Sequence, residues 1–460
     1  MVVFLLVLVV VLALLGAVHW YVWRRLVRDV TVAGSLARRL GTVAVVALPL
    51  LSIAALVSSR AGAPFLLQQA VAWPGFLWLA VLLYLVLALV VGEAVRPLLR
   101  AWLGRRAAAA APAEPVPAAA TGPGPVVSPP APAPAPASET APETEPQPAP
   151  EPQPAPETAT GPGPDGQVVA VEEAGRPVES AAPADVSRRL FVSRVVAGSA
   201  AAVALGTVGY GTYGVLRGPR VKRVTVPLAK IPRAAHGYRI AVVSDIHLGP
   251  ILGRAHTQRI VDTINATQPD LIAVVGDLVD GTVENLGPAA EPLARLRARH
   301  GSFFVTGNHE YFSGADAWVD HVRELGLHPL RNARVEIPAG FDLAGVDDVA
   351  GESEGRGPDF ARALGDRDRA RAAVLLAHQP IVVHDAVRHG VDLQLSGHTH
   401  GGQLWPGNYL AELANPTVAG LERYGDTQLY VSRGAGAWGP PVRVGAPSDI
   451  TIVELASKQA

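Results

Sequence analysis

The chain of 460 residues contains no cysteine, and this absence excludes disulfide bonds, thiolate nucleophiles and cysteine-ligated zinc. It also has little net charge, because 39 lysine and arginine residues offset 40 acidic residues to leave a formal charge of −1. Proteins that bind nucleic acids usually carry a clustered basic excess. We therefore expect no nucleic-acid partner.

The residues that are present are distributed unevenly along the chain. Leu, Val and Ala dominate the first hundred residues, Pro, Ala and Glu the next eighty, and 12 of the 13 histidines follow residue 220. The composition predicts a membrane domain at 1–103, a linker at 104–187, a fourth transmembrane segment at 188–217 and a catalytic domain at 221–460. Metal and acid–base chemistry is thereby confined to the last of these.

Four apolar segments predict transmembrane helices, for which about 20 residues cross a bilayer. They cover about residues 2–23, 42–57, 73–95 and 190–215. The loop between the first two carries five arginines and the next loop only Arg60. The positive-inside bias therefore places the N-terminus outside and the first loop in the cytoplasm. A cleaved signal peptide is a poor alternative, because no basic region precedes the first segment. We expect a multi-pass protein of the cell membrane.

The stretch from residue 107 to 186 holds 21 of the chain's 41 prolines and almost no large apolar residues. Such a stretch cannot bury enough surface to offset the entropy of ordering its backbone. It predicts a disordered, partly polyproline-II linker that acts as a spacer.

The fourth apolar segment opens with Ser187-Arg188-Arg189-Leu190-Phe191-Val192 and continues into a Gly- and Ala-rich core. This pattern is typical of a twin-arginine export signal, with the twin-arginine translocase as partner. Alternatively, Arg188 and Arg189 are ordinary cytoplasmic flanking charges. Both interpretations place the following domain outside the cytoplasm, whereas a basic cluster beyond the segment favours the opposite orientation: Arg217, Arg220, Lys222 and Arg223.

Five short motifs between Tyr238 and Gln403 contain the residue types that bind divalent metals. They are Ser244-Asp245-Ile246-His247, Gly276-Asp277, Gly307-Asn308-His309-Glu310, Ala377-His378 and Gly397-His398-Thr399-His400. Four of them directly follow short β-like apolar runs, and open α/β sheets assemble their sites from loops at the carboxyl ends of strands. Two divalent cations held close together form a clamp for in-line displacement at phosphorus. The motifs therefore indicate phosphoester hydrolysis.

Spacing within the motifs indicates how they would bind metal. Asp245 and His247 are two residues apart in a segment that we expect to be extended, so both side chains would project to the same side. His398 and His400 repeat this spacing. Asp277 follows a strand-like run and is the natural bridging carboxylate, because its two oxygens can serve two ions.

The five motifs resemble those of the calcineurin-like metallophosphoesterase family, and Gly397-His398-Thr399-His400-Gly401-Gly402-Gln403 is similar to its membrane-associated or exported bacterial branch. The resemblance spans about Lys230 to Leu455. It implies one metal ion held by Asp245, His247, Asp277 and His400. It implies a second held by Asp277, Asn308, His378 and His398. A metal-bound hydroxide would be the nucleophile, and His309 would face the substrate as general acid or transition-state stabiliser.

Other polar residues have simpler expected roles. Glu310 and Tyr311 are expected to orient or pack the site rather than touch substrate, and Asp280 to cap its loop. Seven more histidines are expected to be structural: His236, His256, His300, His321, His328, His384 and His389. The all-nitrogen-and-oxygen ligand set admits Mn, Fe, Zn or a mixed pair.

Apolar runs in the last part predict an α/β fold, a two-sheet β-sandwich flanked by helices. Expected strands cover 238–244, 271–275, 302–306, 373–376 and 391–395, and expected helices 257–265 and 291–299. Two final strands, 429–432 and 450–454, would close the second sheet.

Two functions remain open. The first is a membrane-anchored phosphoesterase that hydrolyses a phosphomonoester or phosphodiester, such as a phospholipid or a cell-envelope precursor. The second is a membrane scaffold or sensor whose metal domain binds a phosphorylated ligand. A proton donor beside two metals favours the enzyme, because a binder needs none. A nuclease is disfavoured because no aromatic-basic platform is found.

Overall fold

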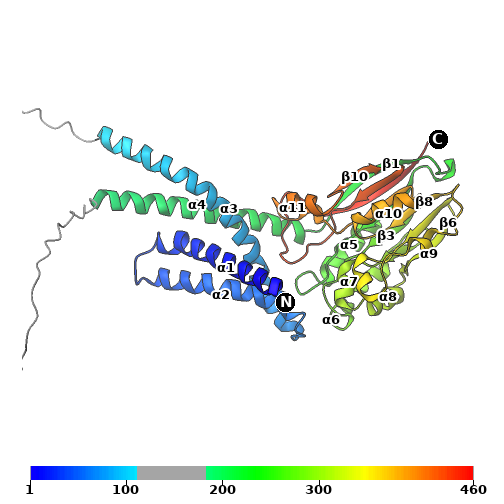
Figure 1. Cartoon of the computed structure of the whole chain (residues 1–460), viewed down its shortest axis with the longest axis horizontal. Coiled ribbons are helices and arrows are strands. Elements are labelled where there is room, and N and C mark those ends of the chain that lie inside the picture. The colour runs from blue at the N-terminus through cyan, green and yellow to red at the C-terminus, as the bar shows by residue number, and fades with distance from the viewer. Residues whose placement is uncertain (1, 111–182, 459–460) are drawn as a thin grey trace, which may run out of the picture.

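The computed structural model describes residues 2–110 and 183–458, so the proline-rich stretch 111–182 of the predicted linker lies outside the described residues. Four long helices stand apart from the remaining elements (Figure 1): α1 (Val2–Trp23), α2 (Leu36–Ser58), α3 (Phe65–Ala110) and α4 (Pro183–Leu216). Within the described residues, these four are long and apolar enough to cross a membrane, with mean hydropathies of 1.6 to 2.6.

Apolar side chains of these helices face outward as well as inward. Leu14 of α1 is 64% exposed and Val91 of α3 is 64% exposed. Lipid is the solvent that suits such a surface. Between the helices, small residues allow close approach, since a Cβ added at Gly75 would lie 2.5 Å from the Leu51 carbonyl oxygen and one at Gly92 would lie 2.6 Å from Val196.

The chain beyond Arg220 folds as two six-stranded mixed sheets. The first has the order β1 (Arg220–Leu228), β12 (Asp449–Ser457), β2 (Tyr238–Val243), β3 (Leu271–Val275), β4 (Ser302–Val305) and β5 (His328–Pro329). The second has the order β10 (Gly420–Tyr424), β11 (Thr427–Val431), β9 (Leu393–Ser396), β8 (Ala372–Leu376), β7 (Phe341–Gly345) and β6 (Ala333–Ile337).

The sheets pack face to face over a core of their own side chains, among them Ile240, Leu343 and Leu395, all fully buried. Helices cover both outer faces because each offers one apolar stripe. α5 (Arg254–Ala266), α6 (Val283–Ala290) and α8 (Ala315–Glu324) cover the first sheet, while α9 (Phe360–Leu364) and α10 (Val383–Arg388) cover the second. The predicted fold class is confirmed.

Shorter helices complete the chain. α7 (Asn308–Ser313) and α11 (Gly407–Ala414) flank the edge where several strands end. The single turns and short helices are η1 (Arg24–Arg28), η2 (Arg233–Ala235), η3 (Glu291–Arg295), η4 (Val349–Glu354), η5 (Pro380–Val382) and η6 (His400–Gly402).

Two expectations about this domain are wrong. The strand predicted at 450–454 belongs to the first sheet, where β12 pairs with both β1 and β2. Its partner β1 was not predicted, because the pattern of apolar residues within a strand does not reveal which strands it pairs with. The helix predicted at 291–299 is only the short η3, which ends at Arg295 because Leu296 leaves the helical region with ψ of 137°.

The sandwich sits at one end of the long helices, beside the α2–α3 loop and the C-terminal end of α4 (Figure 1). Tyr84 of α3 donates a hydrogen bond to the Trp405 carbonyl at 3.0 Å, and the Arg443 amide donates to the Gly211 carbonyl of α4 at 3.3 Å. Val442 is fully buried in the same apolar cluster as Trp78 and Leu89. The two parts therefore share a packed interface.

Candidate metal centre

The ends of five strands bring the predicted site residues together. Asp245 and Asp277 stand two residues past β2 and β3, which are parallel neighbours. His378 and His398 stand two residues past β8 and β9, which are parallel neighbours in the other sheet. Asn308 begins α7, just after β4. Because parallel strands end at the same edge, residues from both sheets meet there.

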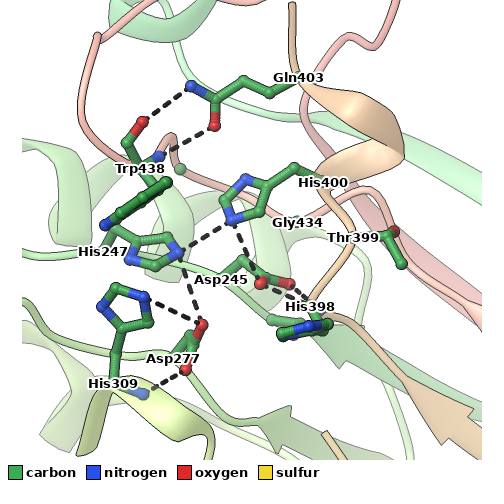
Figure 2. Close-up of polar contacts among 12 residues, drawn as sticks. Asp245, His247, Asp277, His309, His398, Thr399, His400, Gln403, Gly434 and Trp438 are labelled. Atoms are coloured by element: carbon green, nitrogen blue, oxygen red, sulfur yellow. Dashed lines mark hydrogen bonds and ion pairs between the residues drawn. The ribbon is translucent and has the colours of Figure 1, made fainter. Parts of the chain in front are cut away.

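The potential ligand atoms fall into three groups, each within 4.8 Å, and one of them, His247, Asp277 and His309, joins the other two. The first cluster comprises Asp245, His247 and His400. The second cluster comprises Asp277, His378 and His398. Figure 2 shows side chains of both converging from separate loops. Each cluster therefore offers one carboxylate and two imidazoles.

Asp277 lies between the two clusters. Its Oδ2 is 3.2 Å from His378 Nε2 and 3.8 Å from His247 Nε2, while its Oδ1 accepts a hydrogen bond from the His309 backbone amide at 2.9 Å. Burial alone would raise the pKa of this carboxyl, but His378 and His247 hold that pKa below its ordinary value. Asp277 is thus an anion with an oxygen directed toward both groups.

Two imidazole nitrogens at the centre have only each other as hydrogen-bond partner, and a third has no hydrogen-bond partner among the described residues. His247 Nε2 and His400 Nε2 face each other at 3.0 Å. His378 Nδ1 donates to the Val275 carbonyl at 2.9 Å, and its buried Nε2 has no hydrogen-bond partner among the described residues, although Asp277 Oδ2 lies 3.2 Å away. Buried polar groups are normally paired. Imidazole lone pairs beside carboxylates fit divalent cations, so the residues present suit a two-metal centre.

Backbone strain is concentrated in the same place. Five of the predicted ligands have positive φ angles: Asp245 (52°), His247 (49°), Asp277 (52°), His398 (74°) and His400 (52°). Each such residue costs on the order of 1–3 kcal/mol, and strain of this kind clusters at functional sites. The expectation that the two-residue spacings lie in extended segments is therefore wrong. Both pairs reach the centre because the chain turns at each ligand.

Two glycines allow the carboxylates to sit this close to the backbone. A Cβ added at Gly307 would collide with Asp277 Oδ1, and one added at Gly397 would collide with Ser244 Oγ and Asp245 Oδ2. Close approach, rather than a left-handed conformation, is what requires glycine here.

Charged side chains orient the histidines of the first cluster. Asp280 Oδ1 lies 2.9 Å from His247 Nδ1, and the Arg443 guanidinium lies 3.0 Å from His400 Nδ1. Burial lowers the pKa of His247, but Asp280 outweighs it and raises that pKa to about 9. Burial, with His247 and Arg443 nearby, lowers the pKa of His400 well below its usual range.

Neutral groups orient the histidines of the second cluster. The Val275 carbonyl accepts from His378, and Asn308 Oδ1 lies 3.0 Å from His398 Nδ1. Despite burial, Asp277 raises the pKa of His378 well above its ordinary value. Burial, reinforced by His378, lowers the pKa of His398 to about 4.

Glu310 holds the loops beneath the centre, in line with its expected orienting role. Its carboxylate accepts hydrogen bonds from the backbone amides of Asp277, Leu278 and Gly307 at 2.9, 2.8 and 2.6 Å. Burial, with Asp277 nearby, raises the pKa of this carboxyl to about 7. The residue fixes the direction in which Asp277 points.

Comparison with known proteins matches residues 238–402 to the family model described as calcineurin-like phosphoesterase. An uncharacterized metallophosphoesterase of Aquifex aeolicus is 35% identical over 243 residues, which cover 52% of this chain and 92% of that protein. The chain belongs to the calcineurin-like phosphoesterase family. The match includes all five motifs.

A zebrafish transmembrane protein with metallophosphoesterase domain is 39% identical over 264 residues, covering 55% of this chain and 60% of that protein. The chain thus spans less than two thirds of this curated relative. A solved dimetal phosphatase from zebrafish is 11% identical, covering 47% of this chain and 91% of that chain, with a TM-score of 0.32. The named transmembrane relative and the four apolar helices together support membrane association of this metallophosphoesterase.

His309 occupies the open side of the phosphoesterase centre. Its side chain is 16% exposed, whereas that of His247 is fully buried. Its ring packs edge-on against Phe312 and Trp438, with centroids 5.6 and 5.8 Å away. Asp280 Oδ1 lies 2.6 Å from its Nδ1, so one carboxylate contacts both His247 and His309.

All predicted site residues of the phosphoesterase lie at this one edge of the sandwich. Sequence reasoning missed two residues that orient them. Asp280 contacts two imidazoles instead of only capping its loop, and its position three residues after Asp277 was the available signal. Arg443 comes from a loop with no recognisable motif, so nothing in the sequence indicated it.

The other histidines stay apart from the centre. None of the seven expected to be structural belongs to a metal-compatible group among the described residues. His300 Nδ1, for example, lies 2.7 Å from the Tyr238 hydroxyl, and His256 is a buried residue of α5 whose ring nitrogens have no hydrogen-bond partner among the described residues.

Proposed function

We propose that the chain is a membrane-anchored, binuclear-metal-dependent phosphoesterase that hydrolyses a phosphomonoester or a phosphodiester. The supporting observation is that two clusters of matching ligands share Asp277 between them. One ion would be held by Asp245, His247, Asp277 and His400, and the other by Asp277, Asn308, His378 and His398. Mn, Fe and Zn all suit such ligands. Bound cations would supply positive charge to the phosphoryl group and to the attacking water.

The reaction forms one bond and breaks one. An oxygen of water bonds to phosphorus while the ester P–O bond breaks, and a proton must reach the leaving oxygen to give the alcohol and a phosphate product. His309 is placed for this transfer, because its ring lies at the open side and Asp280 contacts its Nδ1 at 2.6 Å. The carboxylate would orient the ring so that Nε2 can donate to the leaving oxygen.

We further propose a multi-pass topology with an extracytoplasmic catalytic domain, organised as 1–103, 104–187, 188–217 and 221–460. In support, the catalytic domain lies at the same end as the N-terminus and the α2–α3 loop, while the loop after α1 lies at the opposite end (Figure 1). That far loop carries the arginines that favour the cytoplasm.

Protease added to protoplasts tests this topology. Loss of the catalytic domain is expected, and a protected domain would contradict the proposal. Replacing Arg188 and Arg189 by lysine tests the twin-arginine signal, since export through that translocase would stop while membrane insertion by another route would continue.

The activity is tested with the purified full chain after chelation and return of Mn, Fe or Zn. Aryl phosphate monoesters and diesters should be hydrolysed only with metal. The His309→Asn variant should lose more activity on alkyl esters than on 4-nitrophenyl esters, because a good leaving group needs no proton donor. Two bound ions without turnover of any ester would instead support the scaffold or sensor.

A further inference from the structure

A cleft of about 290 Å³ lies between the long helices and the metal centre. Both parts of the molecule form its walls. Residues that line it include Leu56 of α2, Phe76 and Leu79 of α3, and His247, His309 and Trp438 of the catalytic domain. The cleft therefore connects the centre with helices that are apolar enough to lie in a bilayer.

The walls of the cleft differ in chemistry. His247 belongs to the first cluster, and Asp280, which also lines the cleft, contacts both His247 and His309. Phe76 and Leu79 present apolar side chains from α3, and Phe76 lies 3.8 Å from the position a Cβ would take on Gly439. A ligand that satisfies both walls carries a polar phosphate and a hydrocarbon chain.

Exposed aromatic residues extend the apolar wall up to the general acid. Phe312 is 67% exposed and Trp438 52% exposed, and both rings flank His309. Gln403 fixes the Trp438 backbone through two hydrogen bonds (Figure 2). Its Nε2 donates to the Trp438 carbonyl at 2.9 Å, and its Oε1 accepts from the Trp438 amide at 3.0 Å. This wall is thus built in place rather than left as a loose loop.

A second apolar surface, on α11, indicates where the bilayer lies. This helix has no buried residue, and Tyr409, Leu410 and Leu413 are 58%, 72% and 84% exposed. Trp405, two residues before α11, is tied to α3 by the hydrogen bond from Tyr84. An exposed apolar face of this kind suits the membrane interface. The catalytic domain would then rest on the membrane, with the cleft opening at its surface.

We propose that the substrate is a phosphoester lipid of the surrounding membrane. Its phosphate lies in the cleft beside His247 and His309, and its hydrocarbon chain runs along Phe76 and Leu79. The reaction is the hydrolysis given above, with the lipid alcohol or the headgroup as leaving group. This inference rests on the proposed phosphoesterase function and names its substrate class. A short-chain phosphoester would leave the apolar wall in water, so the cleft favours a long chain.

The test compares substrates that differ only in chain length, with the full chain in nanodiscs. Ethyl and dodecyl 4-nitrophenyl phosphate serve as diesters, and ethyl and dodecyl phosphate as monoesters. We expect kcat/KM to be at least about tenfold higher for the dodecyl member of the hydrolysed pair, by the free energy of burying several methylenes. Leu79→Trp fills the cleft and should lower this ratio at least about tenfold.

Val90→Trp is the matched control, because Val90 lies on the same helix, is 60% exposed and is not among the residues lining the cleft. It should leave the ratio unchanged. If Leu79→Trp does not accumulate, Leu56→Trp on α2 replaces it, since Leu56 is already 42% exposed.

The outcomes separate the two proposals. If no ester is hydrolysed with any metal, the proposed function fails. Equal rates for the ethyl and dodecyl members of the hydrolysed pair, or a ratio that Leu79→Trp does not change, overturns the lipid substrate alone. A dodecyl preference that Val90→Trp removes equally would also overturn it, because the cleft would then not be the cause.

Discussion

The two clusters of the metal centre contain matching ligands but differ in the neighbours that orient them. In the first cluster, the charged side chains of Asp280 and Arg443 contact the outer nitrogens of the histidines. In the second, the contacts come from the Val275 carbonyl and the Asn308 amide. The first cluster also borders the cleft, through His247.

This difference indicates that the two clusters are tuned in different ways. Neutral partners at strand ends fix geometry without changing the charge of the second cluster. Charged partners shift the proton affinity of the first cluster's histidines as well as fixing their geometry. Substitutions should therefore affect metal-dependent activity most at Asp277, less at Asp280, and not at residues outside both clusters.

Removing the carboxylate shared by both clusters should have the largest effect. Asp277→Asn keeps the shape of the side chain but removes the charge that both ions would use. Turnover should fall by about a thousandfold or more, because metal charge contributes several kcal/mol to the transition state and each 1.4 kcal/mol is a factor of ten. Steady-state kinetics and metal analysis measure this.

The matched control is Asp426→Asn, since the Asp426 side chain is fully exposed. It should retain wild-type turnover. Two tightly bound ions and normal turnover in Asp277→Asn would show that the clusters do not depend on a common ligand.

A charged orienting residue should matter at one cluster more than at the other. Asp280→Asn should weaken metal binding by about 10- to 100-fold, the range typical for partners that orient a metal-bound histidine. The loss should appear in one of two binding events when metal is titrated by calorimetry. Equal weakening of both events would contradict the distinction between the clusters.

Competition between protons and metal ions should test the contact between Asp280 and His247. The pKa of about 9 means that His247 is protonated at neutral pH in the metal-free protein, so a cation must displace that proton. Affinity should rise as pH increases from 7 to 9, by up to about tenfold per unit for each proton displaced, and level off above that. Asp280→Asn should weaken this dependence, while the part due to His378 should remain. Chelator competition at several pH values measures it, and a flat wild-type profile would be the contrary result.

A buried histidine outside both clusters should affect stability and not metal binding. Burial, with Arg259 and Arg443 nearby, lowers the pKa of His256 to about 4. The unfolded chain, with a pKa of about 6.5, takes up the proton first as pH falls. The contribution of His256 to the free energy of unfolding is therefore fully present above a pH of about 6.5 and is lost as pH falls from there to about 4.

Replacing this histidine by leucine should remove that loss. Between pH 7 and 5 the wild type should lose about 2 kcal/mol more unfolding free energy than His256→Leu. Denaturant unfolding followed by tryptophan fluorescence measures the difference. Identical pH dependence in both proteins would assign the acid sensitivity to other groups.

Sequence reasoning found the strands and the ligands for a definite reason. The run Leu271 to Val275 is apolar throughout because it is buried on both faces, and Asp277 follows it at the sheet edge. Such local signals predicted the fold class and the motifs at the sheet edge, and the resemblance to the family implied the ligands of each ion. Motif order then revealed the family.

Long-range and conformational features could not be predicted in the same way. Arg443 reaches His400 across 43 residues of chain, and Leu79 meets His309 at a cleft only after the two parts have packed. The left-handed turns at Asp245 and His247 were also missed, since a two-residue spacing suggested extended backbone. Tertiary packing overrides local preference at these positions.

The most direct test of the account is turnover measured against the number of metal ions bound per chain. We predict that the chelated protein is inactive, that two ions bind, and that hydrolysis follows occupancy of the second. Full activity with one ion, or no hydrolysis with both ions bound, would contradict a binuclear phosphoesterase.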